Sequence, residues 1–115
     1  MTSKIKHGSI VWVDFGDLDG KSVQKGKRPA ICISNKKSTF SSQTLNVIPL
    51  TSQCKRNIPV HVAITNPVLD KPSFVLPEQI ATIDKTQVCQ CVGQVSNEEL
   101  QLIKKAVAMQ LGIKN

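Results

Sequence analysis

The sequence predicts a mainly β fold, a small barrel of short strands followed by one C-terminal helix. Three observations predict it: the apolar runs are short, turn residues separate them at close spacing, and helical periodicity is confined to the last stretch. Short strands at this spacing favour a small barrel over a parallel sheet. A length of 115 residues is typical of one domain, so we expect residues 1–115 to form a single unit.

The expected strands are apolar runs bounded by segments rich in Gly, Pro, Asn or Ser. The first, residues 8–15, has Ile10 and Trp12 on one face and further apolar residues on the other, so both faces should be buried. Pro29 stands near the start of the second strand, where a missing N–H is tolerated. Further strands are expected at residues 28–35, 44–50, 59–65, 73–76, 80–83 and 87–95, with polar loops at 16–27 and 36–43.

One amphipathic helix is expected after the last strand. Ser96 and Glu99 fit the S-x-x-E capping box, which satisfies two backbone N–H groups at the start of a helix. Apolar residues then recur at helical spacing and predict a stripe that packs on the barrel. Gly112 suits the position after the helix end. The stripe consists of Leu100, Ile103, Val107 and Leu111.

The formal net charge of +7 is spread unevenly along the chain. Residues 1–60 contain ten Lys and Arg against three Asp, whereas residues 61–115 contain five basic and five acidic residues. A basic half predicts a polyanionic partner, because each phosphate that a cation neutralises releases condensed counterions. A solvated basic surface that binds nothing accounts for the charge equally well. No apolar run is long enough to span a bilayer and no signal peptide is recognisable, so we expect a cytoplasmic protein without membrane contacts.

The cysteines are expected to be reduced and buried. Without an export signal, their even number does not predict disulfides, and the C-x-C of Cys89 and Cys91 has no second Cys or His pair at zinc spacing. The sequence also lacks a P-loop, a serine elbow, H-E-x-x-H and a carboxylate cluster for Mg²⁺. We therefore expect no metal and no cofactor. The four cysteines are Cys32, Cys54, Cys89 and Cys91.

Two residues are candidates for phosphate chemistry because of their positions. Arg28 begins a strand after a Gly-rich loop, and its planar guanidinium matches two phosphate oxygens. Thr51 ends the third strand, the expected neighbour of the second, where its hydroxyl could donate to a phosphate oxygen. An ordinary salt bridge for Arg28 and β-propensity for Thr51 are the alternatives. The two histidines, His7 and His61, do not resemble the pair of a histidine-dependent nuclease.

Four segments, in order, resemble the MazF/PemK family of toxins. Residues 8–15 (GSIVWVDF) resemble its opening strand, and residues 24–35 carry its Q-x-G-x-R-P signature followed by an apolar strand. Residues 47–52 match its third strand with the terminal threonine, and residues 76–85 resemble its E-Q-I-x-T-I-D-K segment. Each motif alone is weak, but the four together with the capped helix cover nearly the whole chain. The chain departs from the family pattern at Ser9, Val23 and Ala81.

The resemblance implies an SH3-like barrel of the PemK/CcdB type, built as a homodimer. It implies an endoribonuclease that cuts single-stranded RNA at short sequences, without a metal and independently of the ribosome, and leaves a 2′,3′-cyclic phosphate and a 5′-hydroxyl. The implied protein partner is an acidic, MazE-like antitoxin. Arg28 and Thr51 match the family's catalytic pair. A substrate-binding role is implied for residues around that pair, Gln24, Gly26, Lys27, Ser52, Glu78 and Gln79.

The physical chemistry of RNA cleavage agrees with this implication. The substrate's own 2′-hydroxyl is the nucleophile, so the reaction needs no covalent enzyme residue. Arg28 would stabilise the charge that develops on the phosphorane, and Thr51 would hold a non-bridging oxygen. The sequence does not assign the general base.

Two other functions remain open for a protein of this fold. One is a catalytically silent barrel that binds RNA or protein, and the other is a toxin that inhibits DNA gyrase, since a fold alone never fixes a function. The match at Arg28 and Thr51 favours the ribonuclease over the gyrase inhibitor, which would have no need of that pair.

Overall fold

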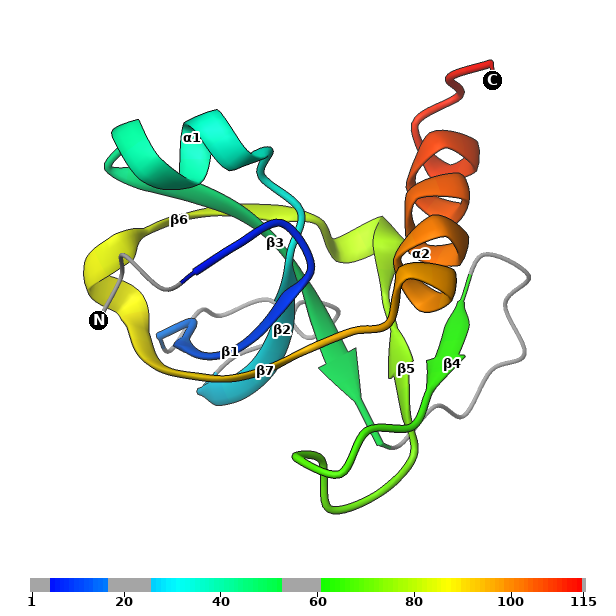
Figure 1. The fold of residues 1–115 in the computed structure, drawn as a ribbon, viewed down its shortest axis with the longest axis horizontal. Coiled ribbons are helices and arrows are strands. Elements are labelled where there is room, and N and C mark those ends of the chain that lie inside the picture. The colour runs from blue at the N-terminus through cyan, green and yellow to red at the C-terminus, as the bar shows by residue number, and fades with distance from the viewer. Residues whose placement is uncertain (1–4, 17–25, 53–60, 115) are drawn as a thin grey trace.

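Seven strands form one curled antiparallel sheet in the computed structural model, which describes residues 5–16, 26–52 and 61–114 (Figure 1). The strand order is β4-β5-β3-β2-β1-β7, and β6 pairs with β3 off this path. The strands are β1 Ser9–Asp14, β2 Lys27–Cys32, β3 Thr44–Thr51, β4 Val62–Ile64, β5 Ser73–Val75, β6 Ala81–Asp84 and β7 Val88–Gln94. The helices are α1 Lys36–Ser41 and α2 Asn97–Gln110, with the 3-10 helices η2 Pro77–Gln79 and η3 Lys85–Gln87.

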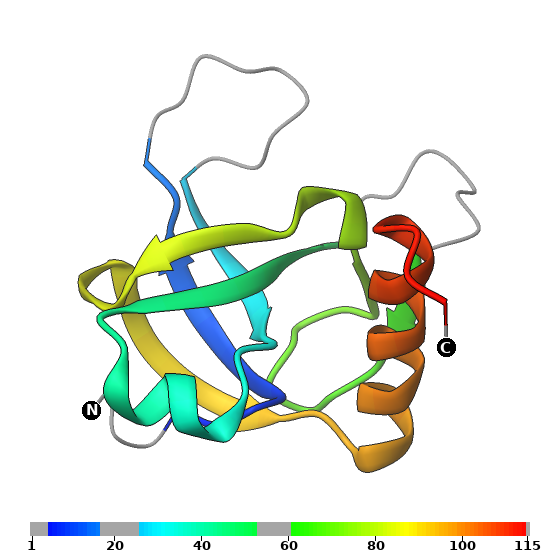
Figure 2. The same ribbon diagram turned by 90° about the horizontal axis from the view of Figure 1, so that it is seen from above.

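Strand β3 joins the two parts of the sheet. It pairs with β2 along one edge, and on the other edge it pairs with β6 near its start and with β5 near its end. Thr44 lies opposite Asp84 of β6, whereas Thr51 lies opposite Phe74 of β5. The change of partner sends the two ends of β3 into different surroundings, one beside η3 and the other beside β5 (Figure 2).

The predicted mainly β fold with a C-terminal helix is confirmed, but the barrel is not closed. Over the described residues β6 pairs only with β3, and β7 pairs only with β1. Helix η3 links β6 directly to β7, so the sheet curls without a ladder of hydrogen bonds across the opening (Figure 2).

Several expected strands are longer in the prediction than in the structure, and two of them differ most. Strand β2 ends at Cys32 rather than at residue 35, and the Ser34 hydroxyl accepts a hydrogen bond from the Asn46 backbone N–H at 2.8 Å. Strand β4 covers Val62–Ile64, while residues 59 and 60 of the expected strand lie outside the described residues. In both segments the apolar alternation continues beyond the last residue that pairs with a neighbouring strand. Alternation alone does not show where strand pairing stops, so the prediction was too long.

Both faces of the sheet are buried, as the first strand predicted. Ile10 belongs to a core cluster that includes Leu100 and Ile103 of α2, whereas Val11 belongs to a second cluster without residues of α2. Both Ile10 and Val11 are fully buried. Burying a side chain of this kind contributes about 1.5–3 kcal/mol, so the two clusters together fix the curl of the sheet.

Helix α2 has the predicted capping box. The Ser96 hydroxyl accepts from the Glu99 N–H at 3.1 Å, and the Glu99 carboxylate accepts from the Ser96 N–H at 3.1 Å. Gly112 adopts a φ of 69° after the helix, as predicted. The predicted stripe is wrong at Leu111, which is 52% exposed because the helix ends at Gln110.

Helix α1 occupies a segment that the sequence predicted as a polar loop. The Asn35 side chain caps it by accepting from the Ser38 N–H at 2.8 Å. The segment lacks an apolar period, so Asn35 was the available signal. Neither α1 nor α2, nor the short helices in the described ranges, is long and apolar enough to cross a membrane.

The described cysteines are free thiols. Cys32 is buried, Cys91 is half-buried and Cys89 is exposed, so the prediction of burial is right for Cys32 and wrong for Cys89. Cys54 lies outside the described residues. Desolvation in the core is the main reason why the pKa of the Cys32 thiol is raised.

Candidate active site

Two glycines hold the ends of the β1–β2 connection together. The Gly26 N–H donates to the Gly16 carbonyl at 2.8 Å, and the Phe15 N–H donates to the Gly26 carbonyl at 2.9 Å. Their φ angles of 77° at Gly16 and 73° at Gly26 lie in the left-handed region that favours glycine. This closure fixes the start of β2 and with it the backbone of Arg28, two residues later.

Arg28 and Thr51 lie at matching ends of neighbouring antiparallel strands. In the β2–β3 ladder Ala30 lies opposite Pro49. Continued by two residues toward the strand ends, this register sets Arg28 opposite Thr51. The arginine is exposed and the threonine is half-buried. The strand pairing therefore brings a cation and a hydroxyl together from positions that are 23 residues apart in the sequence.

Arg28 and Thr51 line the same surface hollow, which has a volume of about 300 Å³. One wall is formed by the ends of β1, β2 and β3 and the residue that follows β3. The residues of this wall are Trp12, Lys27, Arg28, Pro29, Leu50, Thr51 and Ser52.

The opposite wall comes from the segment between β4 and β5. Val68 and Leu69 supply its apolar part, and Asp70 and Lys71 supply its charged part. The first residue of β5, Ser73, completes the wall and donates its hydroxyl to the Lys71 carbonyl at 3.0 Å. A connection of eight residues between two three-residue strands thus closes over the strand ends.

The charge of the hollow suits an anion. Three cations, Lys27, Arg28 and Lys71, line it against the single carboxylate of Asp70 among the described residues. An arginine fork and a hydroxyl are groups that bind the non-bridging oxygens of a phosphate. Across the described ranges, no three residues among His, Cys, Asp and Glu are grouped to hold a metal ion. The arrangement can therefore bind a phosphate and donate hydrogen bonds to it.

Two larger hollows lack this combination. One, of about 1030 Å³, lies along α2 and is lined by apolar residues with Lys104 and Lys105, and the other, of about 730 Å³, lies beside α1 and Phe40. Neither joins an arginine to a strand-end hydroxyl. Size alone would select the wrong place, so we assign the candidate site by its chemistry.

The predicted site residues divide into three groups. Lys27, Arg28, Thr51 and Ser52 line the hollow, and Gly26 closes the hairpin next to it. Gln24 lies outside the described residues. Glu78 and Gln79 lie on η2 and do not line the hollow.

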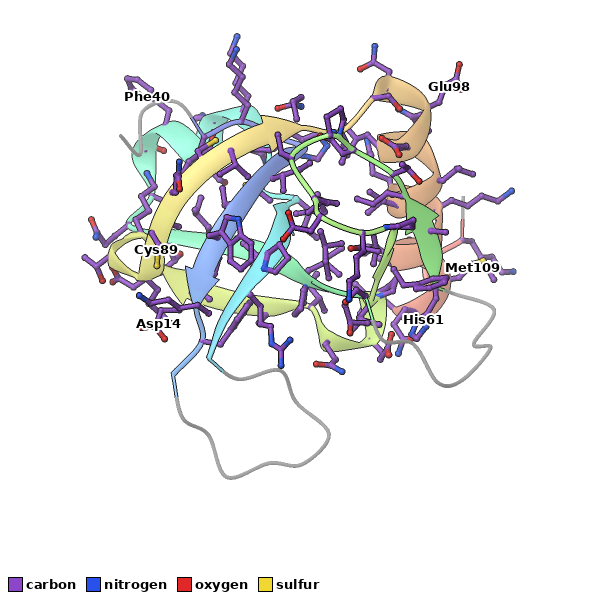
Figure 3. The ribbon with its side chains drawn as sticks, turned by 90° about the horizontal axis from the view of Figure 1, so that it is seen from below. Asp14, Phe40, His61, Cys89, Glu98 and Met109 are labelled. Atoms are coloured by element: carbon purple, nitrogen blue, oxygen red, sulfur yellow. The ribbon has the colours of Figure 1, made fainter. Side chains whose placement is uncertain are left out.

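Glu78 is held by His61. The His61 Nε2 lies 2.8 Å from Oε2 and 3.1 Å from Oε1 of Glu78, and the two side chains are 7% and 29% exposed. This contact ties the residue before β4 to η2 (Figure 3 labels His61). The other histidine, His7, lies 3.1 Å from the Ser34 carbonyl through its Nδ1. Neither histidine lines the hollow.

Eight residues of the hollow were not found by sequence reasoning, among them Trp12, Asp70 and Lys71. Trp12 had been interpreted only as part of a buried strand. Asp70 and Lys71 belong to a turn about 40 residues beyond Arg28, and only the pairing of β4, β5 and β3 brings them to it. The charged Asp-Lys-Pro sequence was the available signal, and it is equally typical of any exposed turn.

Comparison with known proteins decides the family. Residues 6–111 match the model of the family described as PemK-like, MazF-like toxin of type II toxin–antitoxin system. The chain belongs to this family. The resemblance predicted from the four sequence segments is thereby confirmed, and the match covers every described residue that lines the hollow.

Relatives and solved structures agree with the family match. The protein named Endoribonuclease MazF from Staphylococcus saprophyticus is 31% identical over 112 residues, which are 95% of this chain and 92% of the relative. MazF from Deinococcus radiodurans has a similar fold, with a TM-score of 0.81 at 21% identity over 94% of this chain and 96% of that one. A mycobacterial endoribonuclease solved in complex with its cognate antitoxin gives a TM-score of 0.77 at 22% identity, over 100% and 99% of the two chains.

Proposed function

We propose that this toxin is an endoribonuclease that cuts single-stranded RNA at the hollow between β2, β3 and the β4–β5 connection. The observation that carries the proposal is that Arg28 and Thr51 line one cationic hollow. Family membership and the relative named Endoribonuclease MazF support it. The substrate therefore has to present a phosphate that an arginine and a threonine at the ends of two strands can bind.

The reaction is an internal transfer within the RNA. The 2′-oxygen of the ribose attacks the adjacent phosphorus and loses its proton, and the bond between phosphorus and the 5′-oxygen breaks. The 5′-oxygen leaves with a proton, and the products carry a 2′,3′-cyclic phosphate and a 5′-hydroxyl. The nucleophile comes from the substrate, so the protein has to position the phosphate, stabilise its charge and move protons.

Arg28 and Thr51 act on the phosphate itself. Arg28 stabilises the extra charge on the phosphorane and donates a hydrogen bond to the leaving oxygen, while Thr51 holds a non-bridging oxygen. The loss of one such donor typically raises the barrier by about 2.7–4 kcal/mol. Arg28 acts through its charge and its hydrogen-bond donors, and the general base is not assigned.

The remaining predicted residues bind the substrate around this pair. Lys27 and Ser52 act within the hollow, beside Arg28 and Thr51 respectively. Gly26 positions the strand that carries Arg28. We propose that Gln24, Glu78 and Gln79 contact RNA beyond the hollow. Their positions follow from the family pattern, and Glu78 keeps its contact with His61 in this arrangement.

The proposed setting is that of a type II toxin. The protein works in the cytoplasm as a single domain and as a homodimer, without a metal or other cofactor. An acidic antitoxin holds it inactive. The solved mycobacterial endoribonuclease, described as bound to its cognate antitoxin, supports this pairing. The net charge of +7 favours both an acidic protein and RNA as partners.

Purified protein and a long unstructured RNA in EDTA test the proposal. We expect discrete fragments that end in a cyclic phosphate, and a roughly hundredfold to thousandfold slower reaction in Arg28→Ala or Thr51→Ala. Phe40→Ala is the matched control, because Phe40 is 87% exposed and lies on the far side from Asp14 and the ends of β1 and β2 (Figure 3). Intact RNA at high concentrations of folded wild-type protein would contradict the proposal and favour a catalytically silent barrel that binds RNA or protein.

A further inference from the structure

The floor of the hollow is apolar and is built across three strands. Trp12 of β1 lies opposite Pro29 of β2. Continuing the β2–β3 register places Pro29 next to Leu50 of β3, and all three line the hollow. Paired residues of neighbouring strands point to the same face of a sheet, so these side chains form one continuous row. Arg28 and Thr51, the neighbouring residues on β2 and β3, line the same hollow beside this row.

Trp12 differs from its neighbours on the same strand. Ile10, Val11 and Val13 are fully buried, whereas Trp12 is only half-buried. An indole confined to a core would bury its large apolar surface. Here part of that surface lines a hollow that also holds three cations.

The hollow combines the two features of a nucleotide-binding site, an apolar surface with an aromatic ring and a group of cations beside it. Proteins that hold single-stranded RNA combine aromatic rings, on which bases stack, with basic groups that follow the phosphates. A volume of about 300 Å³ lies at the lower end of the range for small-molecule pockets and suits one nucleotide.

We propose that Trp12 is a base-stacking residue, and that Trp12 and Pro29, backed by the fully buried Leu50, hold the nucleobase next to the phosphate bound by Arg28 and Thr51. The inference rests on the proposed function and adds to it a subsite and a determinant of specificity. A base stacked on Trp12 fixes its ribose relative to the phosphate. Val68 and Leu69 limit the space above the row, so the base that fits here contributes to the choice of cleavage sequence.

The fluorescence of Trp12 provides a direct test. The chain contains one tryptophan and no tyrosine, so its intrinsic emission reports this residue alone. The probe is the RNA segment around a mapped cleavage site with a single 2′-deoxynucleotide at the cut, which removes the nucleophile and keeps every base. We expect saturable quenching of the emission. An abasic nucleotide on one side of the cut should abolish the quenching, and inorganic polyphosphate should cause none.

Substitutions at Trp12 test the subsite by kinetics. Trp12→Leu should lower kcat/KM roughly fivefold to a hundredfold, mainly through KM, because base–aromatic stacking has about that strength. Trp12→Phe should restore most of the loss, and its Tm provides a check on folding. Phe40→Leu is the matched control, an exposed aromatic outside the hollow, and should leave kcat/KM unchanged. The abasic substrate should slow the wild type but hardly affect Trp12→Leu.

The outcomes separate this inference from the proposed function. If the wild type cuts RNA but its emission is unchanged by the deoxy probe, or a folded Trp12→Leu variant cuts as fast as the wild type, the base subsite is wrong and the ribonuclease stands. If the wild type cuts nothing, no cleavage site can be mapped, and the long unstructured RNA becomes the probe. If that RNA quenches the emission without being cut, the subsite stands and the ribonuclease is wrong. If it neither binds the probe nor cuts, both are wrong.

Discussion

The two ends of β3 each place a threonine beside a charged residue, but with different consequences. At the start, Thr44 lies opposite Asp84, whose Oδ1 accepts from the Thr86 N–H at 2.9 Å, the Thr86 hydroxyl at 2.8 Å and Gln43 at 3.2 Å. At the other end, Thr51 and Arg28 line a cationic hollow.

The difference lies in the surroundings of the charge. The Asp84 carboxylate forms part of a capping box with Gln87 and serves to start η3. Two of its hydrogen bonds come from Thr86 in the same turn, and the third comes from Gln43, 41 residues away in the sequence, which directly precedes β3. The Arg28 end is assembled from four separate parts of the chain, and they enclose a space for a ligand. A charged residue at a strand end can thus have two roles. Where hydrogen-bond donors surround it, it caps a helix, and where the tertiary structure encloses a cavity beside it, it forms part of a candidate site.

The largest expected effect comes from the core between the two ends. Ile48→Ala, at a fully buried position, should lower the free energy of unfolding by about 2–5 kcal/mol. Denaturant titration measures it. Arg28→Ala, at an exposed position, should stay within about 0.5 kcal/mol of the wild type in the same titration while its RNA cleavage is lost. A strongly destabilised Arg28→Ala would show that the arginine holds the fold together, and the contrast between the ends of β3 would be weaker.

A smaller effect is expected at the glycine that closes the β1–β2 connection. Gly26→Ala forces a β-carbon into a φ of 73°, where the left-handed conformation costs about 1–2 kcal/mol. Among the described residues beyond its chain neighbours, no atom lies within 4 Å of the new carbon, so backbone strain is the cause. We expect slower cleavage, because the start of β2 shifts and moves Arg28.

Gly112→Ala is the control for Gly26→Ala. Its φ is 69° and the space around it is equally open, but it follows α2, far from Arg28 in the sequence. Thermal unfolding should show a similar loss for both variants, and only Gly26→Ala should slow cleavage. If both substitutions changed the cleavage rate equally, the closure of the β1–β2 connection would have no specific role in positioning Arg28.

The smallest effect is expected at the start of β3 and depends on pH. The hydrogen bond from the Thr86 backbone, followed by those from Thr86 and Gln43 side chains, holds the pKa of Asp84 below its usual value. The ionised form is favoured in the folded state, so this contribution is present above the unfolded pKa and is lost as the pH falls through the folded pKa.

The variant Asp84→Asn tests this. Its Tm should lie slightly below that of the wild type at pH 6 and approach it as the pH is lowered below 3.8, the ordinary pKa of the carboxyl. RNA cleavage near neutral pH should be unchanged, because Asp84 lies outside the hollow. A Tm difference that does not change with pH would assign the effect to packing rather than to charge.

Local signals predicted the two ends of α2 and the positions of the strands along the chain well. The Ser96–Glu99 box and Gly112 each act within a few residues, and the structure contains both. The two-sided burial of β1 followed from its apolar alternation. Helix α1 was missed because its residues are polar, so its one local signal was the cap at Asn35. The open edge between β6 and β7 was missed because periodicity reports faces and contains no information about pairing.

The sequence predicted only those site residues that lie at the ends of expected strands or in the family's motifs. Arg28 and Thr51 were found from their positions after a loop and at the end of a strand, and the family resemblance raised them above their alternatives. Trp12, Asp70 and Lys71 could not be found in this way. The hollow they line depends on the β1–β2 and β3–β5 registers, which join residues that no local pattern connects.

The central claim is that Arg28 and Thr51 act together on one phosphate, and a double-mutant cycle tests it most directly. The rate of cleavage in EDTA is measured for Arg28→Ala, Thr51→Val and the double variant under single-turnover conditions. Two groups that bind the same phosphate should be coupled, so the double variant should lose much less than the product of the two single losses. Losses that simply multiply would show that the two side chains act independently, and the shared phosphate site would be wrong.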